Sequence, residues 1–129
     1  MARFLVLGNE SVFEDGTAVR LMPLLKKEFP MHEFVVFDPN ESLPVENKDL
    51  LLIDVVRGIK RVEIFTEEDI DRFSDFPKVG VHDFDLTFQL KLLLRLGKIK
   101  NVRIIGIPHG MDDKTALAQA VNALRALRL

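Results

Sequence analysis

The chain has 129 residues, 47% of them hydrophobic and 29% charged, and a formal net charge of −2. These values are typical of a single globular domain, here residues 1–129, and they leave no basic face for nucleic acid. Because no cysteine is present, disulfides, thiolate metal sites and a cysteine nucleophile are excluded.

Short apolar runs predict the strands of a buried, mostly parallel sheet. We expect strands at residues 4–7, 34–37, 50–53, 78–81 and 102–106. A further short strand at 61–65 follows the third strand too closely for a parallel crossover. It should therefore form an antiparallel hairpin or lie outside the sheet.

Amphipathic segments between these runs predict helices. The first follows Gly16, is kinked or restarted by Pro23, and ends at Pro30. Thr66 caps a short helix, and a long helix runs over about 85–96. A final helix begins near Asp112 and continues to Leu127.

The alternation of strands and helices predicts an α/β fold. We expect a three-layer α/β/α sandwich with about five strands, in flavodoxin-like or phosphorylase/hydrolase-like order. No apolar segment is long enough to cross a membrane, and the apolar stretch near the N-terminus is too short for a signal-peptide core, so we expect a reducing cytoplasm and no membrane insertion. Nothing in the sequence demands more than a monomer.

Three residues, Asp15, Asp54 and His82, carry the functional prediction. Asp54 and His82 each follow a predicted strand, and Asp15 lies in the loop after the first one. Parallel sheets place ligand sites at the carboxyl ends of their strands, so we expect the three to meet at one edge. Two carboxylates and an imidazole suit zinc, nickel, iron or manganese and leave room for water, as a catalytic metal site requires.

Each of these residues also has a structural interpretation. Asp15 could cap a helix, Asp54 could belong to a turn, and His82 could make only a backbone contact. Ser11 with His82 and Asp54 imitates a hydrolase triad, but no Gly-x-Ser-x-Gly motif surrounds it.

Three further titratable residues are weaker candidates. Glu14 is either a fourth acid of the site or a solvated loop carboxylate. His109 faces the same edge as an accessory or inert residue, and His32 lies at the opposite edge, where we assign it no role.

The sequence resembles the nickel-dependent endopeptidases that mature [NiFe]-hydrogenases by trimming the C-terminus of the large subunit. The resemblance rests on five short motifs spread in order over nearly the whole chain. They are Val6-Leu7-Gly8-Asn9, Glu14-Asp15-Gly16, Leu52-Ile53-Asp54, His82 followed by Leu86, and Ile104-Ile105-Gly106-Ile107-Pro108.

The resemblance implies that Asp15, Asp54 and His82 are both the catalytic and the metal-binding residues of an aspartic-type endopeptidase. It also implies that nickel arrives already seated in the large-subunit precursor, with zinc or cadmium as possible substitutes. The sequence departs from the family pattern at Ala18, where a glycine is expected, and at 55–61, which lacks a Pro-Gly; the region after Pro108 is also short. Two alternatives stay open: a non-catalytic nickel-sensing adaptor for hydrogenase assembly, and a flavodoxin-like small-ligand module.

Overall fold

The computed structural model describes residues 1–8, 16–37, 41–45, 47–76 and 82–129, and for residues 82–85 it describes the backbone only. The strands are β1 (Arg3–Val6), β2 (Glu33–Val36), β3 (Asp49–Val56), β4 (Glu63–Thr66) and β5 (Asn101–Pro108). The helices are α1 (Thr17–Glu28), α2 (Ile70–Asp75), α3 (His82–Arg95) and α4 (Asp113–Leu127), and a 3-10 turn, η2 (Glu67–Asp69), precedes α2.

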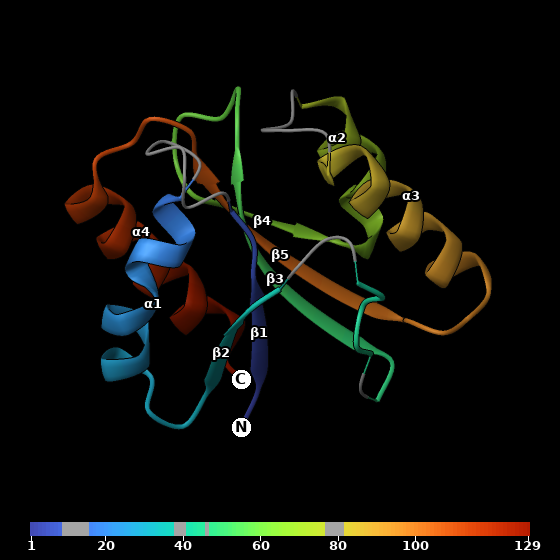
Figure 1. Cartoon of the computed structure of the whole chain (residues 1–129), viewed down its shortest axis with the longest axis horizontal. Coiled ribbons are helices and arrows are strands. Elements are labelled where there is room, and N and C mark those ends of the chain that lie inside the picture. The colour runs from blue at the N-terminus through green and yellow to red at the C-terminus, as the bar shows by residue number, and fades with distance from the viewer. Residues whose placement is uncertain (9–15, 38–40, 46, 77–81) are drawn as a thin grey trace.

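The elements form three layers. The five strands make one sheet in the order β2-β1-β3-β5-β4. Helices α1 and α4 cover one face of it, and α2 and α3 cover the other (Figure 1). The predicted α/β/α sandwich is therefore confirmed, including the position of β1 next to β3 that the flavodoxin-like order requires.

Four strands are parallel and one is antiparallel. β3 and β5 pair along their full lengths, from Asp49↔Asn101 to Val56↔Pro108. β4 runs antiparallel, as expected, but it pairs with β5 and makes no hairpin with β3. β5 pairs with β3 along its whole length, which leaves β4 to cover the outer edge of β5.

Two predicted boundaries are wrong by three residues. β3 does not stop at Ile53: it continues through Asp54, Val55 and Val56, because the eight-residue register with β5 extends that far. Helix α3 begins at His82 and not near residue 85. The strand predicted at 78–81 falls outside the described residues.

The buried side chains of β1, β3 and β5 alternate between two hydrophobic clusters. Ile53 and Val55 of β3 pack with the helices α1 and α4. Leu52 and Val56 belong to the cluster on the other face, with Phe73 of α2 and the leucines of α3. This alternation fixes which face each strand residue addresses.

Several helix ends are set by local hydrogen bonds that the sequence indicates. Thr66 and Asp69 form a reciprocal capping box ahead of α2. Asp112 caps α4 by accepting a hydrogen bond from the Thr115 backbone N–H at 3.0 Å. Helix α1 continues unbroken on both sides of Pro23, so the proline does not reset its start.

Candidate functional site

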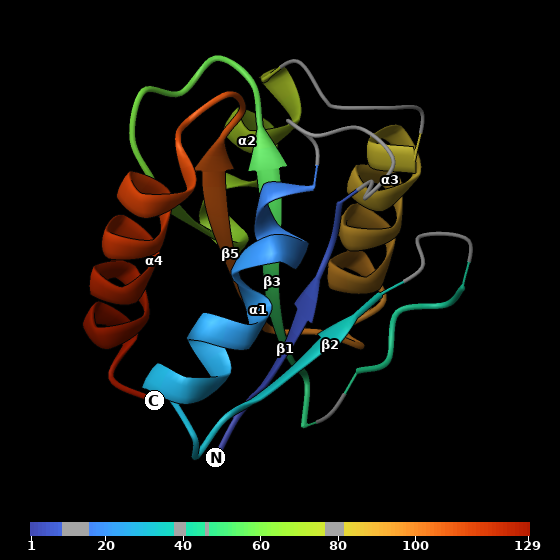
Figure 2. The ribbon, with the colours of Figure 1, turned by 60° about the vertical axis from the view of Figure 1, so that its left-hand side comes forward.

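The carboxyl ends of the parallel strands form the edge at which the site is expected. In Figure 2 the arrowheads of β3 and β5 point to the same edge at which α1, α3 and α4 begin. The first residues of these helices are Thr17, His82 and Asp113. Helix N-termini carry partial positive charge, so this edge favours anionic groups.

Asp54 is the central acid of this edge. It lies inside β3 and only 3% of its surface is exposed. One carboxylate oxygen, Oδ1, accepts a hydrogen bond from the Val55 backbone N–H at 2.8 Å, and Oδ2 is also buried. The interpretation of Asp54 as a turn residue is wrong, because the residue is part of a central strand.

The alternation along β3 directs Asp54 toward the layer of α2 and α3. Its neighbours Ile53 and Val55 face α1 and α4, so Asp54 shares the opposite face with Leu52 and Val56. His82 is the first residue of α3, the helix that covers this face. The fold thus brings the backbone of His82 and the side chain of Asp54 to the same face and the same edge of the sheet.

The strand position beside Asp54 is Gly106, its Cα partner on β5. A Cβ atom at Gly106 would lie 2.9 Å from Phe65 Cε2 and 3.2 Å from Val56 Cγ2. Ile59 also packs against this glycine, with its Cδ1 atom 3.4 Å from the same point. The absence of a side chain at Gly106 therefore lets aromatic and aliphatic groups pack against the strand next to the buried carboxylate.

The other predicted ligands are only partly placed. Asp15, Glu14 and Ser11 lie outside the described residues, and the side chain of His82 does as well. Among the side chains that the structure describes, no three His, Asp or Glu groups come together as a metal site. The shared metal site of Asp15, Asp54 and His82 therefore stays a prediction.

The two remaining histidines lie at opposite edges, as expected. The His109 backbone N–H donates to the Val56 carbonyl at 2.9 Å, which places His109 beside the end of β3. His32 instead accepts a hydrogen bond from the Ala2 backbone N–H at 3.1 Å, near the start of β1. Burial, more than the nearby N-terminal charge, lowers the pKa of His32.

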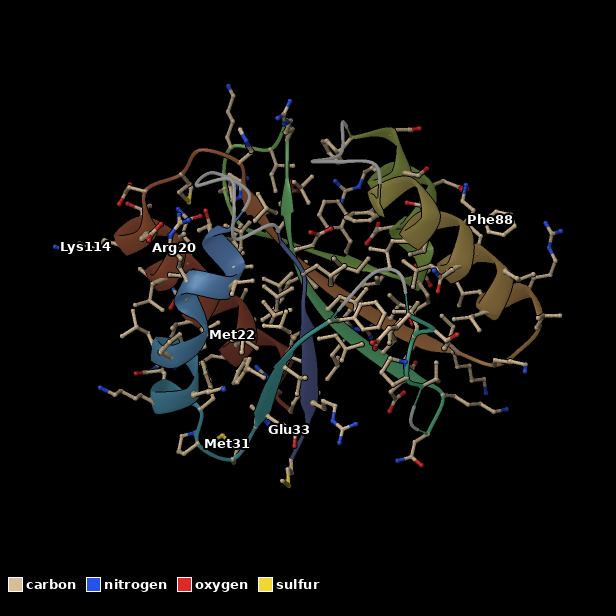
Figure 3. The ribbon with its side chains drawn as sticks, in the orientation of Figure 1. Arg20, Met22, Met31, Glu33, Phe88 and Lys114 are labelled. Atoms are coloured by element: carbon tan, nitrogen blue, oxygen red, sulfur yellow. The ribbon has the colours of Figure 1, made fainter. Side chains whose placement is uncertain are left out.

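An ion pair joins α1 and α4 at the edge formed by the carboxyl ends of the parallel strands. Arg20 of α1 donates from Nε and Nη2 to the two carboxylate oxygens of Asp113, each at 2.9 Å. Figure 3 shows Arg20 reaching toward the first turn of α4, where Lys114 also lies. The hydrogen bonds from Arg20 lower the pKa of Asp113, and the guanidinium charge adds to that effect.

A basic loop, residues 57–61, follows β3, and we assigned it no role from the sequence. After β3 the chain passes through Arg57, Lys60 and Arg61, all of them exposed. The signal was present in the sequence as three cations within five residues, but such a run alone is also typical of a solvated loop.

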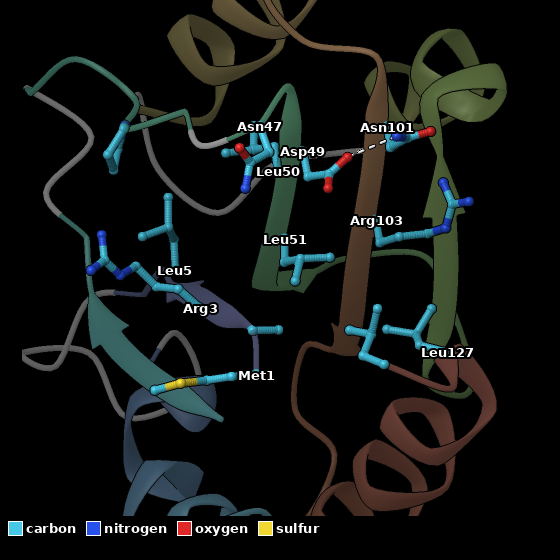
Figure 4. Close-up of a pocket in the computed structure, with 13 residues that line it drawn as sticks. Met1, Arg3, Leu5, Asn47, Asp49, Leu50, Leu51, Asn101, Arg103 and Leu127 are labelled. Carbon is cyan, nitrogen blue, oxygen red and sulfur yellow. Dashed lines mark hydrogen bonds between the residues drawn. The ribbon is translucent and has the colours of Figure 1, made fainter. Parts of the chain in front are cut away.

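A hollow of about 430 Å³ opens at the opposite edge of the sheet, where β1, β3 and β5 begin (Figure 4). Four of the polar side chains that line it, those of Arg3, Asp49, Asn101 and Arg103, have partners. Asp49 accepts a hydrogen bond from Asn101 at 2.7 Å, and Arg103 donates to Glu67 at 3.0 Å. This hollow is remote from Asp54, because Asp49 and Asp54 lie toward opposite ends of β3.

Within the described part of the chain, no helix combines the length and apolar character needed to cross a bilayer.

Comparisons with known proteins identify the fold. No family model and no curated protein sequence matches the chain. Among solved structures, it is similar to the hydrogenase maturating endopeptidase HybD from E. coli, with a TM-score of 0.67 and 18% identity over 98% of this chain and 94% of that one. An uncharacterized protein from Wolinella succinogenes gives a TM-score of 0.61 and 17% identity, over 98% of this chain and 96% of that one. The chain thus has the fold of HybD, and the resemblance drawn from its motifs is confirmed at the level of the fold.

Proposed function

We propose that this protein is an endopeptidase that removes the C-terminal extension of a nickel-loaded [NiFe]-hydrogenase large-subunit precursor. Asp15, Asp54 and His82 would supply the ligands that complete the nickel sphere of the precursor. The nickel is part of the substrate, so cleavage would depend on prior metal insertion.

The observation that carries this proposal is the burial of Asp54 within a central strand of a HybD-like fold. A carboxylate that is 3% exposed is costly unless a cation or hydrogen bonds compensate it. It lies on the face covered by α3, the helix that begins with His82. Asp54, together with a histidine in the helix that begins at this edge, would supply two of the three ligands that the proposal requires.

Asp15, Asp54 and His82 would act mainly by positioning the substrate. Protein ligands that bind the nickel would hold the C-terminal segment of the precursor against the carboxyl edge, with its scissile peptide bond in place. Two routes would be open for activating the attacking water: a carboxylate could accept its proton, or the nickel of the substrate could polarise it together with the peptide carbonyl. The positive ends of α1, α3 and α4 would favour the negative charge that develops on the carbonyl oxygen.

The test uses the intact mass of a large-subunit precursor, with and without nickel, after incubation with the enzyme. We expect the wild-type protein to remove the extension from the nickel-loaded precursor only. Asp54→Asn should abolish the mass change, because the amide no longer supplies an anionic ligand or a base. The matched control is Asp49→Asn, at the other end of β3, where the carboxylate is exposed and bonded to Asn101.

The outcomes separate the candidate functions. Trimming by wild-type and Asp49→Asn but not by Asp54→Asn supports the endopeptidase. Trimming that is unchanged in Asp54→Asn rejects it. Stable binding of the precursor without any change in mass would favour the non-catalytic adaptor.

A further inference from the structure

The basic loop after β3 is held at both of its ends. At its start, the Val56 carbonyl accepts a hydrogen bond from the His109 backbone N–H at 2.9 Å. At its end, the Val62 backbone N–H donates to Gln119 Oε1 of α4 at 2.8 Å. Gly58, with a φ of +92°, turns the chain between these anchors. These two hydrogen bonds hold the ends of the loop backbone in place, so the positions of its side chains are restricted.

This loop lies next to the buried acid of the candidate site. Ile59, in the middle of the loop, packs against Gly106, and Gly106 is the strand partner of Asp54. Arg57 follows Asp54 by three residues, at the carboxyl end of the same strand. The cations of the loop thus border the edge at which a substrate would meet Asp54.

The positive charge of the loop has no counterion among the described residues. Arg57, Lys60 and Arg61 are exposed, and none of them forms an ion pair with the part of the chain that the structure describes. The nearby charges of α1 and α4 cancel, since Arg20 binds Asp113 and Lys114 lies beside Asp112. The loop therefore adds three positive charges to this side of the edge.

We propose that Arg57, Lys60 and Arg61 bind carboxylates of the polypeptide segment that the enzyme cuts. This inference rests on the proposed function, and it adds a specificity: the segment beside the scissile bond is acidic, or ends there in its free α-carboxylate. Guanidinium groups bind carboxylates with two parallel hydrogen bonds, so the two arginines would set orientation as well as affinity. A nucleic acid is the less suitable ligand, because the loop has no aromatic side chain for stacking and the whole chain is acidic.

The experiment measures peptide binding by fluorescence anisotropy and does not require cleavage. The probe is a short, labelled, glutamate-rich peptide with a free carboxy terminus; one comparison peptide has glutamine in place of glutamate, and another has an amidated terminus. The test variant combines Arg57→Gln, Lys60→Gln and Arg61→Gln. The control combines Lys48→Gln, Lys98→Gln and Lys100→Gln, which removes the same charge from exposed positions at the opposite edge.

We expect the loop variant to bind the probe at least about fivefold more weakly than wild type, and the control variant to bind it normally. Binding should weaken as salt rises from about 50 to about 300 mM, because exposed charges are screened. A loss on glutamine replacement assigns recognition to side-chain carboxylates, and a loss on amidation assigns it to the terminus; either result supports the proposal. Equal binding of the probe by wild type and the loop variant, or binding that neither glutamine replacement nor amidation weakens, would overturn it.

Three controls keep the result interpretable. Thermal unfolding of the loop variant checks its fold, and the three single substitutions, each expected to weaken binding in part, replace it if it is unstable. A single-stranded RNA of similar length, if it binds as tightly as the peptide, also rejects the proposal. Failure of precursor trimming with intact peptide binding would refute only the proposed function, whereas trimming without any loop-dependent binding would refute only this inference.

Discussion

Gly106 is the position at which the packing next to Asp54 is most directly testable. Its φ is not positive, so alanine fits the backbone, and any effect of Gly106→Ala arises from space alone. The new methyl group would lie 2.9 Å from Phe65 Cε2, well inside van der Waals contact. Phe65 cannot move away easily, because it is fully buried and packs edge-on against Phe73 with 5.1 Å between ring centroids.

The expected loss of stability follows from two opposing effects. Overpacking a core position costs about 1–3 kcal/mol. Replacing glycine reduces the freedom of the unfolded chain and returns about 0.4–1 kcal/mol. Gly106→Ala should therefore lower the free energy of unfolding by roughly 1–2 kcal/mol. Urea unfolding followed by far-UV circular dichroism measures this, since the chain has no tryptophan to report by fluorescence.

A double-mutant cycle identifies Phe65 as the cause. In a Phe65→Leu background the overlapping Cε2 atom is gone, so Gly106→Ala should cost at least about 0.5 kcal/mol less than in the wild type. The contact with Val56 Cγ2 at 3.2 Å remains in both backgrounds, which is why the cost does not vanish. An equal cost in the two backgrounds, or no cost in the wild type, would refute the reasoning.

Three further substitutions test the helices that frame the sheet, each by urea unfolding. Asp113→Asn weakens the two-point contact with Arg20 and should cost about 0.5 kcal/mol at neutral pH, because both groups are partly exposed. Since the pKa of Asp113 is lowered in the fold, this stability is present above the ordinary carboxyl pKa and is lost as pH falls through the folded-state pKa. Thr66→Ala removes the hydroxyl cap of η2 and should cost about 1 kcal/mol, whereas Thr66→Ser should be nearly neutral. Pro23→Ala restores an amide donor inside α1, worth about 3 kcal/mol, but frees the unfolded chain at a cost of about 1 kcal/mol, so the free energy of unfolding should rise by about 2 kcal/mol; a loss of stability would contradict this.

The layers of the fold were predictable because they follow from local pattern. Runs such as Phe4–Leu7 and Leu50–Ile53 are apolar on both faces, as a parallel sheet covered by helices on each side requires. The partner of β4 was not predictable from the sequence. Its four residues carry no information on which strand they meet, and the outcome depends on β5, about forty residues further along the chain.

The position of Asp54 at the carboxyl ends of the strands was predictable from the sequence, but its place within β3 was not. A charged residue after four apolar ones suggested that β3 ends at Asp54, whereas the strand continues through it. Sequence reasoning fails at such a position because it assumes that a central strand buries apolar groups, and functional residues are the usual exceptions. The basic loop was missed because arginine and lysine are common in solvated loops. Its importance depends on the hydrogen bond that holds its end to α4 and on the packing of Ile59 against Gly106, and neither can be read from the sequence.

The insertion of β5 between β3 and β4 has a consequence for how the protein is made. On a ribosome, β1, β2 and β3 are released early and have one another as partners, but β4 has no strand to pair with until residues 101–108 have emerged. The apolar side of β4, including Phe65, therefore stays open to solvent and to chaperones through much of synthesis. The nascent chain completes its sheet late, and a premature stop before β5 would leave two strand borders available for aggregation.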